Sequence, residues 1–123
     1  MRRWARVFAG IVLSSGIAAA QAHAHLRSAV PADGSVVSAP PSQVVLDFSE
    51  PARLTAAWIQ RSGGPKSKIE RLPRQSAASV AVPLPALSPG LYELSWRALS
   101  ADGHIVPGRI HFTVTRPGAA RGR

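Results

Sequence analysis

Apolar and polar residues alternate with a period of two in several short runs of this chain, and proline and glycine separate the runs. The clearest runs are Val44–Phe48, Leu91–Ala98 and Arg109–Val114. Successive side chains of a strand point to opposite faces of a sheet, so such runs are typical of half-buried strands. Beyond the first 22 residues, no stretch keeps its apolar residues at helical spacing. The pattern therefore predicts an all-β domain.

Three weaker runs extend the pattern: Leu54–Arg61, Lys66–Leu72 and Ser79–Leu84. About seven short strands at this spacing favour a β-sandwich or a Greek-key barrel. With 123 residues, 46% of them hydrophobic, the chain has the size of one domain with a single core. We expect that core to include Trp58 and Trp96, because an alternating strand tryptophan is usually a packing residue.

The N-terminal region has the order of a bacterial secretory signal peptide. Three arginines lie within Met1–Arg6, and the uncharged stretch Val7–Ala20 is shorter than the roughly 20 residues that span a bilayer. We expect residues 1–22 to be removed on export to the periplasm. Two overlapping Ala-x-Ala patterns allow cleavage, so the mature chain begins at His23 or at His25.

The charge and the absence of cysteine exclude some kinds of site. The net charge of +9 falls to +6 when the three signal-peptide arginines leave, and the alternating Arg, Gly and Ala of residues 116–123 predict a disordered basic tail. Nucleic-acid binding is a poor fit, because the protein is exported and its aromatic residues are not interleaved with basic ones. Because the chain has no cysteine, it can form neither disulfides nor thiolate metal sites.

Histidines occur at two places that suit copper(II). A histidine at a free N-terminus offers its α-amine and its imidazole in one chelate ring, and copper(II) favours tetragonal nitrogen and oxygen ligands. Asp102-Gly103-His104 lies between two clear strands and places a carboxylate and an imidazole two residues apart. Asp-Gly is also what a tight hairpin turn requires, but turn chemistry gives no reason for the histidine. From these residues alone, a copper(II) site and a plain turn both stay open.

Five groups of segments carry a family resemblance in their order and spacing. They are His23-Ala24-His25-Leu26, Pro31-Ala32-Asp33-Gly34-Ser35, Leu46-Asp47-Phe48-Ser49-Glu50-Pro51, Pro89-Gly90-Leu91-Tyr92 with Ser95-Trp96-Arg97, and Ser100-Ala101-Asp102-Gly103-His104 with Phe112-Thr113-Val114. Through them the chain resembles the CopC family of periplasmic copper-resistance proteins. The resemblance implies an immunoglobulin-like Greek-key β-sandwich over residues 23–115 that binds copper(II), with a membrane copper transporter as a candidate partner.

Carried over position by position, the resemblance implies His23, Asp102 and His104 as the copper(II) ligands. The family spacing favours His23 as the first mature residue. His25 would then be third, where its imidazole, the amine and the intervening amides form a competing copper(II) site. Glu50 matches an acidic position near the copper of some family members, and it is either an orienting carboxylate or a surface residue at a strand end.

Two further expectations concern residues outside this ligand set. Some family members bind copper(I) through a methionine-rich stretch, since soft thioether sulfur suits that ion. The only methionine here is Met1, which leaves with the signal peptide, so we expect no copper(I) site. His111 alternates with the apolar Ile110 and Phe112 and should point to solvent.

The leading functional hypothesis is a non-enzymatic protein that sequesters or delivers copper(II) for copper resistance or homeostasis. One alternative is a copper-dependent oxidative enzyme, because an N-terminal histidine with a second imidazole resembles the histidine brace of polysaccharide-oxidising enzymes. Asp102 would fill a position that such enzymes need open. The other alternative is a metal-free sandwich that docks against a protein partner.

Overall fold

The described part of the chain is built from strands. The computed structural model describes residue 10 and residues 24–116, so the expected cleavage site, His23 and residues 117–123 of the expected tail lie outside the described residues. The strands are β1 (Leu26–Val30), β2 (Ser35–Val37), β3 (Gln43–Arg61), β4 (Lys66–Lys68), β5 (Ala77–Pro83), β6 (Gly90–Ser100) and β7 (Ile105–Val114). Residues 10 and 24–116 contain no helix long and apolar enough to cross a membrane.

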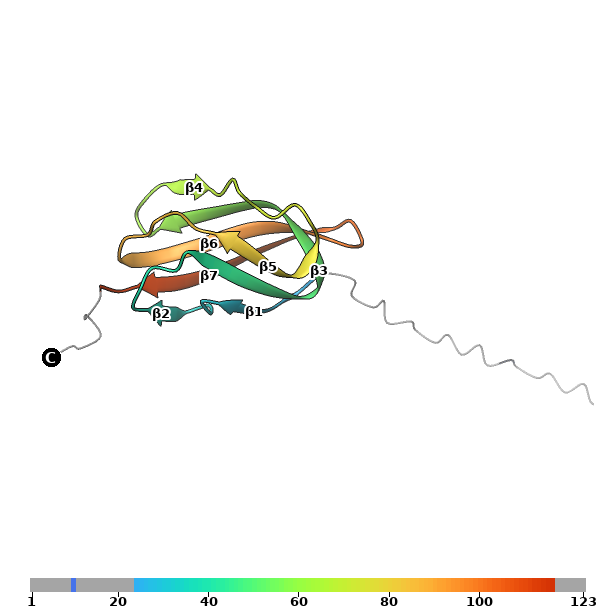
Figure 1. Cartoon of the computed structure of the whole chain (residues 1–123). Coiled ribbons are helices and arrows are strands. Elements are labelled where there is room, and N and C mark those ends of the chain that lie inside the picture. The colour runs from blue at the N-terminus through green and yellow to red at the C-terminus, as the bar shows by residue number, and fades with distance from the viewer. Residues whose placement is uncertain (1–9, 11–23, 117–123) are drawn as a thin grey trace, which may run out of the picture.

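Strand β3 takes part in both layers of a sandwich. Its first half, Gln43–Phe48, pairs with β1 and β5, whereas its second half, Ala52–Arg61, pairs with β4 and β6. Ala52, where the two halves meet, also pairs with β5. Strand β7 continues the second layer beside β6, and β2 adds to β7 in parallel. The pairing is irregular just before Ala52, where Pro51 has no N–H for a ladder hydrogen bond. Figure 1 shows β3 passing from one layer into the other.

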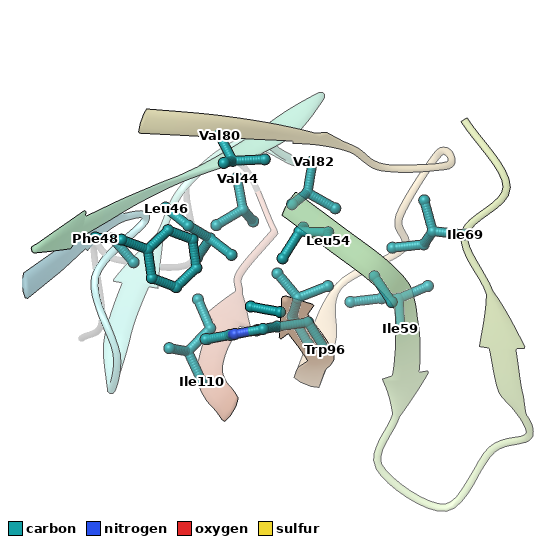
Figure 2. Packing of buried hydrophobic residues seen from close by; sticks show 14 of the residues in the cluster. Val44, Leu46, Phe48, Leu54, Ile59, Ile69, Val80, Val82, Trp96 and Ile110 are labelled. Carbon is teal, nitrogen blue, oxygen red and sulfur yellow. The ribbon is translucent and has the colours of Figure 1, made fainter. Parts of the chain in front are cut away.

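The core lies between the two layers. Figure 2 shows Val44, Leu46, Val80 and Val82 of the first layer facing Trp96 of the second. Side chains that are almost fully buried include Phe112, Leu94, Ile110 and Val114. Burying one such side chain stabilises the fold by about 1.5–3 kcal/mol. The expected all-β sandwich is confirmed, and its core is the main source of stability in a chain without disulfides.

The strand predictions are confirmed in type and differ in their limits. The runs Val44–Phe48 and Leu54–Arg61 form the two halves of β3 instead of two separate strands. Strand β4 ends at Lys68, and the following Ile69 is buried in the core. The sequence pattern missed β1 and β2, which are short and pair only with strands distant in the sequence.

The prediction for Trp58 is wrong, whereas Trp96 is 3% exposed and lies in the core as expected. Regular alternation would place Leu54 and Trp58 on the same face of β3. The pairing of β3 with β6 shifts between Leu54 and Ala56, and this bulge changes the phase. Beyond it Ile59 points inward and Trp58 lies on the outer face, half-buried.

Candidate metal centre

The turn between β6 and β7 carries the predicted Asp102-Gly103-His104 sequence. The Gly103 N–H donates to the Ser100 carbonyl at 3.0 Å, and the Ser100 N–H donates to the His104 carbonyl at 2.9 Å. Gly103 has a φ of 87°, in the left-handed region that glycine enters without strain. Asp-Gly thus closes a tight hairpin, as the sequence predicts, and leaves the two flanking side chains on the same turn.

Asp102 and His104 contact each other directly. His104 Nδ1 lies 2.7 Å from Asp102 Oδ2, and the His104 N–H donates to Asp102 Oδ1 at 3.1 Å. The histidine side chain is 69% exposed and the aspartate side chain 23%. An ionised carboxylate only accepts hydrogen bonds, so Nδ1 of the imidazole donates in this contact. The pair places a carboxylate oxygen and a ring nitrogen side by side at the tip of the turn.

The start of the described chain is fixed beside this turn. Ala24 is 1% exposed, and its N–H donates to Ser100 Oγ at 3.0 Å. Ser100 itself is 3% exposed and stands two residues before Asp102. Figure 1 shows the beginning of the described chain and the β6–β7 turn at the same end of the sandwich. His23 lies outside the described residues, yet it is covalently joined to the Ala24 nitrogen that Ser100 holds.

His25 is attached to the first layer. Its N–H donates to Ser49 Oγ at 2.9 Å, and its carbonyl accepts the Ser49 N–H at 2.7 Å. Its side chain is exposed. The backbone of residues 24 and 25 is therefore held at two points, one on each layer.

Glu50 lies at the same end of the sandwich but is not part of the Asp102–His104 pair. It precedes Ala52, whose partner in β6 is Ser100. Within residues 24–116 no three His, Cys, Asp or Glu side chains come close enough together to hold a metal ion. Of the predicted site residues in this range, the structure brings together only Asp102 and His104.

His111 has carboxylate neighbours that sequence reasoning did not foresee. Its ring points outward, as expected, and its side chain is 46% exposed. Nε2 lies 2.9 Å from Glu93 Oε2, Nδ1 lies 4.0 Å from Asp33 Oδ1, and the backbone N–H donates to Asp33 Oδ1 at 2.8 Å. His111 therefore helps to attach the loop before β2 to β7, and it belongs to a different place from the β6–β7 turn.

Sequence reasoning also missed the role of Ser100. In β6 the buried positions are Tyr92, Leu94, Trp96, Ala98 and Ser100, so a hydroxyl occurs at the last inward position of an apolar alternation. A buried hydroxyl needs a hydrogen-bond partner. A polar residue at an inward-facing position of β6 was therefore the sequence signal that Ser100 forms a hydrogen bond with another part of the chain.

We expect Ser100→Ala to lower the free energy of unfolding by about 1–3 kcal/mol, because it leaves the buried Ala24 N–H without an acceptor. Urea unfolding measures the loss, and hydrogen exchange of the Ala24 amide should become faster. Ser95→Ala in the same strand is the control, because the buried Ser95 Oγ has no hydrogen-bond partner among the described residues. Equal effects of the two substitutions would contradict the assigned role of Ser100.

Comparison with known proteins places the chain in a family. Residues 26–115 match the CopC domain. The chain is 35% identical over 98 residues to protein YobA of Escherichia coli K12, covering 76% of this chain and 79% of that protein. It is 35% identical over 118 residues to copper resistance protein C of Escherichia coli, covering 85% and 90%.

A solved structure agrees with this assignment. The crystal structure of CopC from Methylosinus trichosporium OB3b superposes with a TM-score of 0.67 at 30% identity, covering 76% of this chain and 95% of that chain. Sequence match and fold thus agree over the same sandwich. The chain belongs to the CopC domain family.

Proposed function

We propose that this protein binds copper(II) outside the cytoplasm, with His23 at the processed N-terminus and with Asp102 and His104 as the further ligands. The domain spans residues 23–115, follows a signal peptide of residues 1–22 and precedes a basic tail of residues 116–123. The relative named copper resistance protein C supports copper as the cargo.

The hydrogen bond from the Ala24 N–H to Ser100 Oγ is the observation that carries the proposal. This bond holds the Ala24 nitrogen, which is covalently bonded to His23, against Ser100. Ser100 precedes Asp102 by two residues. Cleavage before His23 would create a free α-amine next to this fixed point. The amine and the imidazole of one residue supply two nitrogens, His104 supplies a third, and Asp102 supplies an oxygen, which is a ligand set that copper(II) favours.

Asp102 and His104 can bind the same copper(II) only if the metal takes the place of the proton on Nδ1, because a metal at Nε2 lies on the far side of the ring from the carboxylate. His104 Nδ1 and Asp102 Oδ2 lie 2.7 Å apart, a spacing that two neighbouring ligands of one ion can have. In this proposal the hydrogen bond between the two side chains belongs to the metal-free protein, and copper(II) replaces it. Glu50, at the same end of the sandwich, is an orienting carboxylate in this proposal.

The backbone bonds of the N-terminal segment argue against the competing site at His25. That site would bind copper(II) through the deprotonated amide nitrogens of Ala24 and His25. Both amides donate hydrogen bonds in the structure, to Ser100 Oγ and to Ser49 Oγ. Forming the competing site would remove both attachments of the segment, so we favour ligation by the first residue.

The proposed role is sequestration or delivery of copper(II), without catalysis, and a membrane copper transporter is the candidate recipient. A copper(I) site is not part of the proposal, because Met1 is the only methionine of the chain and it precedes the cleavage position.

Processing and ligation can be tested on the exported protein. Intact mass and N-terminal sequencing should give His23 as the first residue. Titration with copper(II), followed by electron paramagnetic resonance, should give one tetragonal, nitrogen-rich site. A chain that retains residues 1–22, or a nitrogen set that includes backbone amides, would refute ligation by an N-terminal His23.

A further inference from the structure

The outer face of the second layer gathers basic side chains from three strands, β4, β6 and β7. Residues paired directly across antiparallel strands share a face, and Lys68, Trp58, Ser95 and Arg109 form one such row. Arg97 and Lys66 lie on the adjacent rows. The cationic face is defined here by Lys66, Lys68, Arg97 and Arg109, all exposed.

Two of these cations converge on one aromatic ring. Lys66 Nζ lies 5.3 Å from the centroid of Trp58, and Arg97 Cζ lies 5.4 Å from it. Cation–π attraction holds each group over the ring, so one indole gathers two positive charges around it. An anion bound beside Trp58 would be attracted by both groups.

No carboxylate of residues 24–116 forms an ion pair with the four cations. Glu93 is the acidic residue on the adjacent row, and its carboxylate is engaged by His111 at 2.9 Å. The positive charge of the cationic face is therefore not neutralised within the described fold.

Three of the four cations, Lys66, Arg97 and Arg109, line a groove of about 530 Å³ together with Trp58, Pro107 and Glu93. Phosphate-bearing headgroups match the charge, and the amphipathic indole of tryptophan suits the boundary between headgroups and acyl chains. A face spread over β4, β3, β6 and β7 offers several headgroup contacts at once, each basic residue adding to the attraction.

We propose that the cationic face docks the protein on a membrane surface rich in anionic phospholipid. This inference is independent of the copper site, because none of the four cations belongs to the β6–β7 turn or to the N-terminal segment.

The test is co-sedimentation of the exported protein with vesicles of phosphatidylethanolamine and phosphatidylglycerol, compared with vesicles of phosphatidylcholine alone. Binding should require phosphatidylglycerol and fall as salt is added. The double variant Lys66→Gln and Arg97→Gln should bind about 30-fold more weakly, the loss expected for two basic residues. The emission of Trp58 should shift to shorter wavelength on binding, and a Trp58→Phe variant should lack the shift, because Trp96 is already buried.

The control variant Arg27→Gln and Arg71→Gln has the same net charge, but its exposed substitutions lie on β1 and in the β4–β5 connection. It should bind vesicles as the unmodified protein does. Equal weakening of both double variants, or loss of binding only when residues 117–123 are deleted, would overturn the proposal. So would binding to inorganic phosphate or polyglutamate without binding to vesicles. Copper(II) titration of the Lys66 and Arg97 variant should be unchanged, which keeps this test separate from the proposed copper site.

Discussion

Replacing His104 by alanine is expected to lower the copper(II) affinity of the processed protein by about 100-fold or more, because the site loses one of three nitrogens. Changes to groups that merely orient a ligand cost 10–100-fold, so loss of a ligand should cost at least the upper part of that range. The fold should persist, since the His104 side chain is 69% exposed and packs in no core. Competition with a chromophoric chelator measures the affinity, and paramagnetic resonance should show fewer coordinated nitrogens.

His111→Ala is the matched control for this prediction. His111 is also a partly exposed histidine beside a carboxylate, and it lies on β7, the strand that follows the turn. It contacts Glu93 and Asp33 rather than the β6–β7 turn. Removing the His111 side chain should change the copper(II) affinity by less than about twofold. Comparable losses in the two variants, or unchanged affinity in His104→Ala, would rule out the turn as the site.

The parts of the fold that depend on local pattern could be predicted from the sequence. Apolar and polar residues alternate regularly in β6 and β7, and the Asp-Gly sequence of the turn between them fits its geometry. Both the hairpin and the Asp102–His104 pair could therefore be predicted from the sequence. Strands β1 and β2 were not, because each is short and is defined by pairing with distant residues of β3 or β7. Trp58 was misplaced because a single bulge reverses the phase of β3, and no residue near Leu54 marks that bulge in the sequence.

The candidate site was predictable only in part for the same reason. Asp102 and His104 are two residues apart in one turn, so their spacing in the sequence is enough to predict that their side chains lie close together. The approach of the N-terminal segment depends on the contact of Ala24 with Ser100, which are 76 residues apart. Alternation can indicate that Ser100 points inward, but it cannot identify the amide that the hydroxyl binds. Family resemblance supplied the link to His23, and the structure adds the hydrogen bond that supports it.

The largest effect on stability is expected from Leu94→Ala. Leu94 is 0% exposed and stands in the middle of β6, between its partners Ile59 of β3 and Ile110 of β7. Removing its side chain from a packed core should cost about 2–5 kcal/mol, part from lost burial and part from the cavity. Small domains are stable by about 5–15 kcal/mol, so this single change removes a large share of the total. The melting temperature should fall by more than about 10 °C in calorimetry.

Leu91→Ala in the same strand tests whether burial is the cause. Leu91 is 46% exposed, so the same chemical change should alter the free energy of unfolding by less than about 1 kcal/mol. A difference of several kcal/mol between the two variants would show that the inner face of β6 holds the layers together. If both leucines could be removed at similar cost, the sandwich would derive its stability from elsewhere. Because the chain has no cysteine, a disulfide cannot supply it.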